Sequence, residues 1–397
     1  MSRILVLATD VLPFPGFVTT GSGLRAWAIG QALEERGHEI GYAFPRRALQ
    51  AEQADPDSVP ENAIPYEYGE IDGIVRAVAP DCVVAFHWPL VGKIEADVPI
   101  AVDLCGPHLL ELSYQGHDLS EMAKMKVTNL ARADFVFTSG EYQRHYFLPW
   151  LMLAGHDVTR ELIPVVPYSM PPRRPPPTGK ASDLTFVYGG LFLPWQDPSV
   201  GLRVLLDELG RRDRGRLRYF GGRHPFYDVP GGVHERLSRQ LEKHPRVLVR
   251  GLVPFAELVQ VYTGYHVALD LMARNPEREL AFTTRTMVYM WCGLPVIYNN
   301  YSELGGIIES AEAGWCVDPG DEDAIRAVLE EIFGDVDGVL DRGRKAQNLV
   351  MERYTWDRTI APVLEFVERP RRERRGSLWS GRMSRRGWRG LLRRFLE

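Results

Sequence analysis

The chain has 397 residues, of which 45% are hydrophobic and 25% charged, as expected for a globular protein of two ordinary domains. No apolar run is long enough to span a bilayer. The first such run, residues 4–8, is ended by Asp10 and is too short for a signal peptide. The four cysteines have no C-x-x-C spacing. We therefore expect buried, reduced thiols in a cytoplasmic protein and no disulfide framework.

Charge is distributed unevenly along the chain. The net charge is −5, yet residues 369–397 hold eleven arginines against Glu373 and Glu397, so this tail carries about +9 and the remainder about −14. Such asymmetry is typical of a basic tail with an anionic partner.

The first half of the chain alternates short β-rich runs with helical patterns. Residues 3–8 predict a buried strand, and Gly21 and Gly23 then open a helix expected over 24–36. Further strands are expected over residues 40–44, 82–86, 100–104, 135–138 and 162–166. This alternation predicts a parallel, doubly wound sheet.

Polar side chains follow two of these expected strands. His87 comes directly after residues 82–86, Asp103 lies near the end of the next strand, and His108 and Glu111 follow it. The carboxyl ends of parallel strands share one edge of a sheet, and ligands of open α/β sheets bind there. The sequence therefore predicts that these four side chains face one cleft.

The middle of the chain separates two halves. Residues 166–178 are dense in proline, which neither a helix interior nor a central strand accepts. We assign residues 170–182 to a linker. Strands are expected again over residues 184–188, 217–220, 247–249, 267–271, 295–298 and 316–317, which predicts a second α/β half over 183–354.

Residues 279–319 predict half of an anion-binding cleft. Thr283 or Thr284 can cap a helix that carries Arg285 and Thr286 in its first turn. An arginine there opposes the helix dipole, which makes sense where an anion lies at the helix N-terminus. Gly293 ends the helix, and a short buried strand is followed by a polar run that includes Asn300 and Glu303.

Two glycine pairs of the second half also follow strands. Gly189 and Gly190 permit close approach of a ligand to the backbone. Gly221 and Gly222 precede Arg223, a candidate basic contact that could equally lie in a surface turn.

These motifs resemble the donor-site segment of GT-B glycosyltransferases of the family 4 type. The resemblance rests on Thr284-Arg285 before Gly-Leu-Pro-Val-Ile at 293–297, Gly-Gly-Ile-Ile-Glu at 305–309 and Gly-Trp-Cys-Val-Asp-Pro at 314–319. Residues 251–258 are similar to the family loop in which the backbone around Val253 reads the nucleotide base. The chain departs from the family at Val288, where a glutamate is common, at Glu279, one residue short of the usual carboxylate, and in the lack of a basic residue over 191–197.

The resemblance implies two Rossmann-like doubly wound domains that face a central cleft. The first, residues 1–169, would bind the acceptor through His87 and Glu111, and the second, residues 183–354, would bind a nucleotide-sugar. A closing helix over 355–368 would return to the first domain and precede the tail, 369–397. Asp103, His108 and Glu279 are the catalytic candidates. The donor-binding candidates are Gly21, Gly23, Gly189, Gly190, Arg223, Val253, Thr284, Arg285, Thr286, Asn300 and Glu303.

The tail predicts an amphipathic basic helix. Trp388, Leu392 and Phe395 share one face with Leu391 and Leu396, whereas Arg389 and Arg393 lie outside that face. Such a segment suits an anionic membrane surface, and folding on contact is favoured because Gly387 and Gly390 lower its helicity. Packing on the acidic body of the same chain and a disordered tail are the alternatives; a nucleic-acid partner is not expected.

The function implied by the resemblance is transfer of a sugar from a nucleotide-sugar to a glycan or lipid-linked acceptor, with retention and as part of polysaccharide or glycoconjugate synthesis. We expect no cofactor and no metal, since no Asp-x-Asp pair is positioned to bind one. A nucleotide-sugar 2-epimerase and a non-catalytic membrane-associated partner of the same fold are the two alternatives. The expected location is cytoplasmic, peripheral on the inner face of the membrane.

Overall fold

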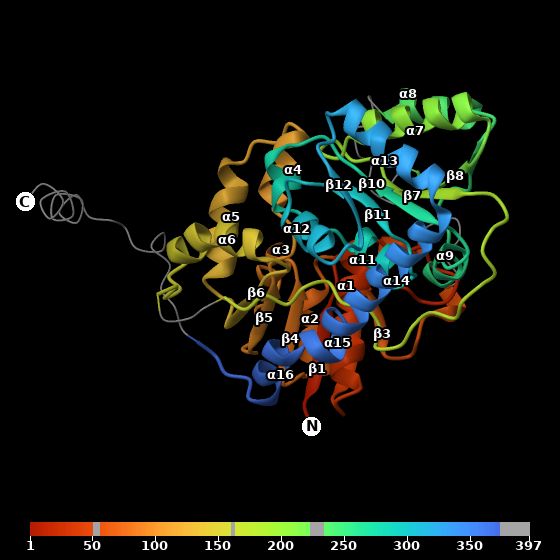
Figure 1. Ribbon diagram of the computed structural model, residues 1–397. Helices are drawn as coiled ribbons and strands as arrows, with labels where there is room; N and C mark the ends of the chain where they lie inside the picture. Colours follow the sequence, from red (N-terminus) through yellow and green to blue (C-terminus); the bar gives the residue numbers. More distant parts are fainter. Residues whose placement is uncertain (51–55, 160–162, 223–233, 374–397) are drawn as a thin grey trace, which may run out of the picture.

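The computed structural model describes residues 1–50, 56–159, 163–222 and 234–373, which form two α/β domains, each built on a six-stranded parallel sheet (Figure 1). The first sheet has the order β3-β2-β1-β4-β5-β6 and the second the order β12-β11-β10-β7-β8-β9. The predicted pair of doubly wound halves is therefore confirmed.

The first sheet is built from apolar strands that are buried on both faces. In β4 (Cys82–Phe86) every residue is buried, as expected for a central strand between two helical layers. The other strands are β1 (Arg3–Leu7), β2 (Glu39–Pro45), β3 (Ala63–Tyr66), β5 (Ile100–Asp103) and β6 (Phe135–Phe137). The sequence reading missed β3, because it contains Pro65; as an edge strand β3 tolerates a residue that has no amide to donate.

The first helix of this domain is α1 (Gly21–Glu34). It includes Gly21 and Gly23, which were expected to precede the helix. Thr20 is its N-cap and accepts a hydrogen bond from the amide of Gly23 at 3.5 Å. The remaining helices are α2 (Ile71–Val78), α3 (Trp88–Val91), α4 (His108–Tyr114), α5 (Ser120–Leu130) and α6 (Glu141–Leu153), with short 3₁₀ turns η1 (Arg46–Gln50) and η2 (Pro56–Ser58).

The strands of the second sheet lie close to their predicted positions. They are β7 (Thr185–Leu191), β8 (Arg216–Gly222), β9 (Val247–Val249), β10 (Val267–Asp270), β11 (Val296–Asn299) and β12 (Gly314–Val317). Its helices are α7 (Ser199–Arg212), α8 (His234–Lys243), α9 (Phe255–Tyr262), α10 (Pro276–Leu280), α11 (Thr284–Trp291), α12 (Glu303–Ser310), α13 (Glu322–Gly334) and α14 (Val336–Arg353).

The chain crosses between the domains twice, and the two crossings are hydrogen-bonded to each other. The amide of Met170 donates to the carbonyl of Tyr354 at 2.9 Å, and the amide of Trp356 donates to the carbonyl of Met170 at 3.0 Å. The expected strand over 162–166 is reduced, in its described part, to a single bridge between Val165 and Thr138.

After α14 the chain packs on the first domain (Figure 1). The expected single closing helix is divided into α15 (Trp356–Thr359) and α16 (Ala361–Glu368), because Pro362 cannot continue a helix from the preceding turn. The ring of Trp356 lies 5.6 Å from that of Trp27, and the ring of Phe366 stacks on Phe135 at 5.2 Å.

All four cysteines are free; Cys82, Cys105 and Cys292 are buried and Cys316 is partly buried. In the described ranges, no helix is long and apolar enough to cross a membrane. Residues 374–397, which include Trp388, Arg389, Leu392, Arg393 and Phe395, lie outside the described residues, so the expected tail helix remains a prediction.

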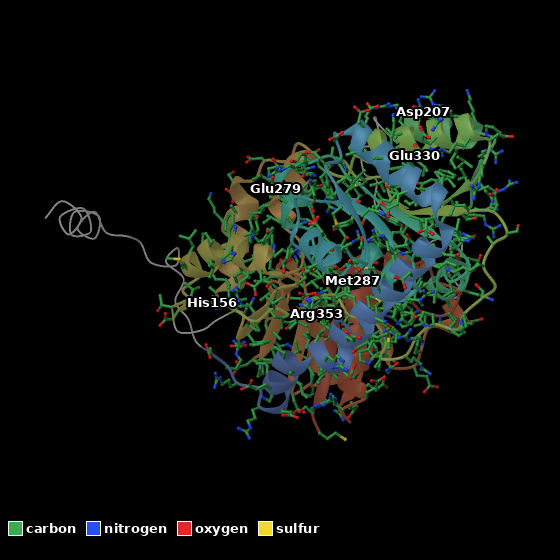
Figure 2. The ribbon with its side chains drawn as sticks, in the orientation of Figure 1. His156, Asp207, Glu279, Met287, Glu330 and Arg353 are labelled. Carbon is green, nitrogen blue, oxygen red and sulfur yellow. The ribbon has the colours of Figure 1, made fainter. Side chains whose placement is uncertain are left out.

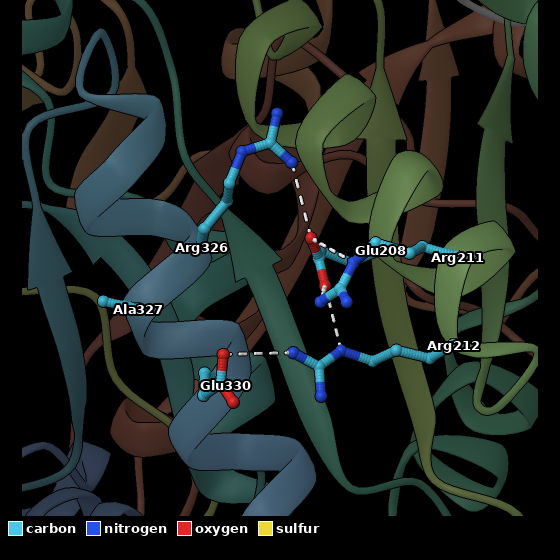
Figure 3. Close-up of a pocket in the computed structure, with 6 residues that line it drawn as sticks. All are labelled: Glu208, Arg211, Arg212, Arg326, Ala327 and Glu330. Carbon is cyan, nitrogen blue, oxygen red and sulfur yellow. Dashed lines mark hydrogen bonds and ion pairs between the residues drawn. The ribbon is translucent and has the colours of Figure 1, made fainter.

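An ion cluster on the outer face of the second domain ties α7 to α13 (Figure 3). The carboxylate of Glu208 accepts hydrogen bonds from Arg211 at 2.6 Å and Arg212 at 2.9 Å on its own helix, and from Arg326 of α13 at 3.4 Å. The bonds from Arg211 are the main reason that the pKa of Glu208 is lowered to about 2. The charged residues that line the hollow of about 390 Å³ at this place are already ion-paired with one another, so we interpret the cluster as structural.

We predict that Glu208→Gln lowers the free energy of unfolding by about 2 kcal/mol at pH 7, because it removes the charge of a nearly buried carboxylate that accepts hydrogen bonds from three arginines. An unfolded glutamate titrates near 4.3, so the stabilisation by Glu208 is complete above that pH. It is lost as the pH falls toward about 2, the folded-state pKa of Glu208.

Urea unfolding at pH 7 and at pH 3 measures the effect. The gap between wild type and variant should shrink on acidification, and Glu330→Gln, whose side chain is 77% exposed, should change little at either pH. A gap that is as large at pH 3 as at pH 7 would contradict this role.

Candidate functional site

A cavity of about 710 Å³ lies between the two domains. The segments that line it follow β1, β4 and β5 in the first sheet and β7, β8 and β10 in the second, so it lies at the carboxyl edges of both sheets. This is where open parallel sheets bind ligands. Nine of the predicted site residues line it: Gly21, His87, His108, Glu111, Gly189, Gly190, Val253, Thr284 and Arg285.

Arg285 is the central cation of this cavity. It lies in the first turn of α11, and its guanidinium donates to the carbonyl of Gly189 at 3.1 Å and to Gln196. Its Nε is 3.7 Å from Asp270, a fully buried carboxylate at the end of β10. Burial opposes its charge, but the fields of Asp270 and of two nearby tyrosines keep the pKa of Arg285 above its ordinary value. Arg285 is therefore a fixed positive charge that one face of the cavity presents to a ligand.

A second guanidinium was missed by the sequence reading. Arg278 and Glu277 of α10 both line the cavity, are nearly buried and form a bidentate pair. Asn275 caps α10 by accepting from the amides of both residues at 3.0 Å, and Pro276 occupies the first turn. The Asn-Pro cap was visible in the sequence, but three charged residues in a row resemble a solvated surface turn. Arg278 is therefore a second guanidinium on the cavity wall, paired with the carboxylate of Glu277.

Glycines let the backbone approach this positive region. Gly190 has φ of +138°, and a Cβ on it would lie 2.5 Å from Nη1 of Arg285. A Cβ on Gly21 would lie 2.9 Å from Oγ1 of Thr284, so the first turns of α1 and α11 meet across the domain boundary. The N-termini of these two helices thus lie beside the cavity, and the amides of a first helical turn have no partner within the helix.

The wall contributed by the first domain holds two histidines. The rings of His87 and His108 meet edge to face at 4.6 Å, and Nδ1 of His108 is 3.2 Å from Glu111. His87 has φ of +116° and ψ of 139°, a region that non-glycine residues rarely occupy and that is concentrated at functional sites. Burial, the nearby His108 and the charge of Lys126 all lower the pKa of His87, so its imidazole is neutral at pH 7.

One end of the cavity is apolar. It is lined by Phe220, Val253, Phe255, Leu258, Tyr262 and Val288. Val253, which was expected near the nucleotide base, and Val288 of α11 both line this cavity and belong to one apolar cluster. Arg223 lies outside the described residues, and its expected contact with the donor remains a prediction.

Two catalytic candidates lie elsewhere. Asp103 is fully buried and does not line the cavity, because its carboxylate is paired with Arg25, whose Nη2 donates to Oδ1 at 3.0 Å and to the carbonyl of Val166 at 2.7 Å. Glu279, which is labelled in Figure 2, is partly exposed and pairs with Arg274 at 2.6 Å. It does not line the cavity. Neither carboxylate lines the cavity, and the catalytic roles expected for Asp103 and Glu279 stay predictions; Glu277, two residues before Glu279, occupies the cavity wall.

Four donor-binding candidates also lie off the cavity wall. Thr286 is fully buried and donates to Asp270 at 2.5 Å, which helps to hold the carboxylate behind Arg285. Gly23 is required by packing, since a Cβ would lie 1.7 Å from the carbonyl oxygen of Val11. Asn300 is exposed in the turn after β11.

Glu303 lies between the domains rather than on the donor. Its carboxylate accepts from the amide of Tyr142 at 3.1 Å, in the first turn of α6. Gly140, the N-cap of α6, offers no side chain for this purpose. A carboxylate from α12 therefore satisfies the N-terminus of a helix in the other domain, where the dipole favours negative charge.

Among the described residues, no group of three or more His, Cys, Asp or Glu side chains is arranged to hold a metal ion. The expectation that the protein needs no metal is not tested by this observation.

No family model and no curated protein sequence matches this chain. Solved structures do match, across both domains. Sucrose-phosphate synthase from Thermosynechococcus elongatus superposes with a TM-score of 0.70 at 14% identity, over 93% of this chain and 98% of that one. The trehalose-6-phosphate synthase OtsA superposes at 0.66 and 12% identity, over 94% of this chain and 100% of that one.

A third match is an α-glucosyltransferase solved in complex with UDP and DNA, with a TM-score of 0.63 and 11% identity over 93% of this chain and 100% of that one. These likenesses, together with the two facing sheets, show that the chain has the GT-B fold, in which two Rossmann-like domains enclose a central cleft.

We predict that Gly190→Ala weakens binding of inorganic pyrophosphate. A non-glycine residue at the positive φ of position 190 is strained by about 1–3 kcal/mol, and the new Cβ displaces the guanidinium of Arg285. Thermal denaturation with and without pyrophosphate measures the loss. Gly306→Ala is the matched control, because Gly306 lies in α12 with nothing within 4 Å of an added Cβ. Equal stabilisation of both variants by pyrophosphate would contradict the placement of the anion.

Proposed function

We propose that this protein is a glycosyltransferase that moves a sugar from a nucleotide-sugar to a glycan or lipid-linked acceptor. The observation that carries the proposal is the convergence of Arg285, Arg278 and the Gly189-Gly190 backbone in a cleft between two facing domains. A diphosphate needs charge-assisted donors and room at the backbone, and this corner offers both.

The same groups would act on the transition state. When the bond between sugar and diphosphate breaks, negative charge grows on the leaving phosphate. Arg285 is held by Asp270, Gly189 and Gln196 before any ligand arrives, so it stabilises that charge without reorganisation. The amides of the first turn of α11 add to the effect. Fixed cations can supply this stabilisation without a metal, which is why we propose a metal-independent reaction.

The first domain would receive the acceptor. His87, His108 and Glu111 line the cavity opposite the two arginines. A neutral imidazole can accept a hydrogen bond from a sugar hydroxyl, and the pairing of His108 with Glu111 fixes the orientation of the second ring. With Asp103 and Glu279 displaced from the cavity, these three groups are our candidates for orienting hydroxyls. Retention of configuration remains an expectation from the family resemblance.

The base of the donor would lie at the apolar end beside Val253. UDP is the first candidate, because the α-glucosyltransferase that superposes on this chain was solved with UDP. The aromatic side chains there, Phe220, Phe255 and Tyr262, suit a planar base.

We predict that one nucleotide-sugar of a panel built on UDP, GDP, dTDP, ADP and CMP raises the melting temperature of the wild-type protein. A ligand at a hundred times its Kd adds about 2.7 kcal/mol of stability. Arg285→Ala should raise the Kd of that ligand by about 10- to 100-fold, which corresponds to the loss of one charge-assisted hydrogen bond. Arg344→Ala, an exposed arginine of α14, is the control.

The outcomes separate the three functions. Release of nucleotide that depends on an acceptor supports transfer, whereas conversion of the free nucleotide-sugar into its epimer without release would show the 2-epimerase. If no member of the panel stabilises the wild type, the transferase proposal fails and a non-catalytic partner of this fold becomes the better account.

We also propose that the tail holds the enzyme at an anionic membrane surface, peripheral on the cytoplasmic side, where lipid-linked acceptors of polysaccharide or glycoconjugate synthesis are found. The support is the arginine-rich amphipathic sequence and the place where the described chain ends. There Arg372 donates to Asp134 at 3.1 Å and the amide of Glu373 donates to the same carboxylate at 2.6 Å, beside the start of β6. The tail thus leaves from the first domain, the proposed acceptor side.

We predict that a chain ending at Glu373 no longer sediments with vesicles of anionic phospholipid. Its melting temperature should still rise with the same nucleotide-sugar that stabilises the full chain. The truncation removes eight arginines and Glu397, a net charge of about +7, and each positive charge is worth about 1 kcal/mol near such a surface. Vesicles of neutral phospholipid are the control. Equal sedimentation of both chains would show that the tail is not the anchor.

A further inference from the structure

The wall that the first domain contributes to the cavity has an apolar part beside its histidines. Leu112 of α4 and Met122 of α5 line the cavity together with His108 and Glu111. Both apolar side chains pack on a core cluster of the first domain, yet each is only partly buried. Part of their apolar surface therefore remains accessible from the cavity, next to the groups that we expect to orient a hydroxyl of the acceptor.

Further polar groups are few on this wall. Apart from the two histidines and Glu111, the described residues that follow β4, β5 and β6 add two amide side chains to the cavity, those of Gln115 and Gln143. Both amides are engaged within the protein, since Gln115 donates to the carbonyl of Glu111 at 3.2 Å and Gln143 accepts from Ser139 at 2.7 Å. A second sugar ring buried here would leave hydroxyl groups without partners, which is costly.

The apolar wall continues along α5 to the outer surface. Met125 lies one turn after Met122 on the same face of the helix, and it is 45% exposed. The charged side chains that flank these two methionines, Glu121 and Lys124, form an ion pair with each other at 2.6 Å. An apolar strip without net charge therefore leads from the cavity wall to the surface of the first domain.

This strip adjoins a second exposed apolar area on α6, which packs beside α5 (Figure 1). The second half of α6 contains no Asp, Glu, Lys or Arg, and its Met152 and Leu153 are 56% and 37% exposed, although the outer face of a surface helix is normally polar. Just after α6, Nε2 of His156 lies 2.9 Å from the carbonyl oxygen of Leu130, the last residue of α5. Asp134, which holds the end of the described chain, follows four residues later. The apolar area thus lies near the point where the basic tail begins.

We propose that the acceptor is an amphiphilic lipid whose hydroxyl head group lies at His87 and His108 and whose alkyl chain lies on Leu112 and Met122 and leaves the cavity past Met125. The proposal rests on the transferase function proposed above and selects a lipid acceptor over a soluble glycan. Its basis is a wall with a few convergent polar groups beside an apolar lining, the usual composition of a site for such a ligand. Methionine side chains are flexible, which suits contact with an alkyl chain.

The direct test is an NMR titration of full-length protein with ¹³C-labelled methionine methyl groups. The chain has ten methionines, and the variants Met122→Leu and Met125→Leu assign the two signals of the strip. The probes are n-octyl β-D-glucoside below its critical micelle concentration and methyl β-D-glucoside, which has the same head group. The octyl compound should shift both signals to saturation, whereas the methyl compound should not. The signal of Met351, on α14 of the second domain, should stay in place.

Chain length and substitution give the expected magnitudes. Each methylene that moves from water onto the apolar wall should lower the Kd about fourfold, so octyl glucoside should bind about fifteenfold more tightly than hexyl glucoside. Met122→Gln keeps the length of the side chain but adds an amide, and it should raise the Kd of octyl glucoside by about 10-fold. Met351→Gln, at another partly buried methionine, is the matched control. Leu112→Asn provides a second variant of the wall if Met122→Gln does not fold.

Three results would overturn the apolar subsite. The first is an equal response of the Met122 signal to octyl and methyl glucosides, or no response to either, which would favour a soluble glycan acceptor. The second is a shift confined to Met383, which would show that the probe binds the tail and not the cavity wall. The third is a wild-type Kd for octyl glucoside in a folded variant of Met122 or Leu112.

The nucleotide-sugar panel on wild-type protein separates this proposal from the proposed function. Stabilisation by a nucleotide-sugar without a response of Met122 to octyl glucoside would remove the lipid acceptor and leave the transferase. A response of Met122 without stabilisation by any nucleotide-sugar would leave an apolar binding site in place and contradict its use as an acceptor site.

Discussion

The geometry of the cleft depends on one buried interaction, the placement of Arg285 against Asp270. A guanidinium in the first turn of a helix is disfavoured by the helix dipole, and a buried carboxylate without a cation is disfavoured by desolvation. Each group offsets the cost of the other at 3.7 Å. Thr283 and Thr286 hold Asp270 from the side, at 3.1 and 2.5 Å, so the arginine is fixed in the direction of Gly189 and Gly190. The resulting charge is preorganised, which is what stabilisation of a leaving phosphate requires.

The two domains are held around this charge by polar contacts and by the apolar side chain of Leu24, which packs in a core cluster of the second domain. Glu303 reaches the N-terminus of α6, Gly21 lies against Thr284, and the paired crossings at Met170 and Tyr354 form a narrow connection. Relative motion is the usual expectation for two domains joined by a narrow connection, so opening and closing of the cleft is the expected motion. Closure would bring the histidine wall and the arginine wall onto the same ligand.

The sequence predicted the fold well because buried parallel strands are short, apolar and repeated. Residues 82–86 and 247–249 were assigned with the observed bounds, whereas β3 was missed because Pro65 hides an edge strand. Arg285 could be predicted, since a cation in a first helical turn is a local signal with a physical reason. Arg278 could not, because nothing in three consecutive charges reveals which of them is buried.

One cause explains why Asp103 and Glu279 were expected in the site although neither lines the cavity. Asp103 and Glu279 are polar residues near strand ends or helix starts, and sequence position alone does not show that Arg25 or Arg274 lies opposite them. The ammonium of Lys126 on α5 likewise lies 4.2 Å from the ring centre of Trp150 on α6, a contact that no local sequence pattern reveals. Long-range pairing of charges is therefore the part of this site that only the tertiary structure provides.

The central claim is that Arg285, Arg278 and Gly190 form the diphosphate site, and the most direct measurement is a crystal structure with the nucleotide that stabilises the protein. The account predicts phosphate density within hydrogen-bond distance of the Arg285 guanidinium and beside Gly190, with the base at the apolar end near Val253. Phosphates that point away from Arg285, or a nucleotide bound outside the cleft between the domains, would contradict it.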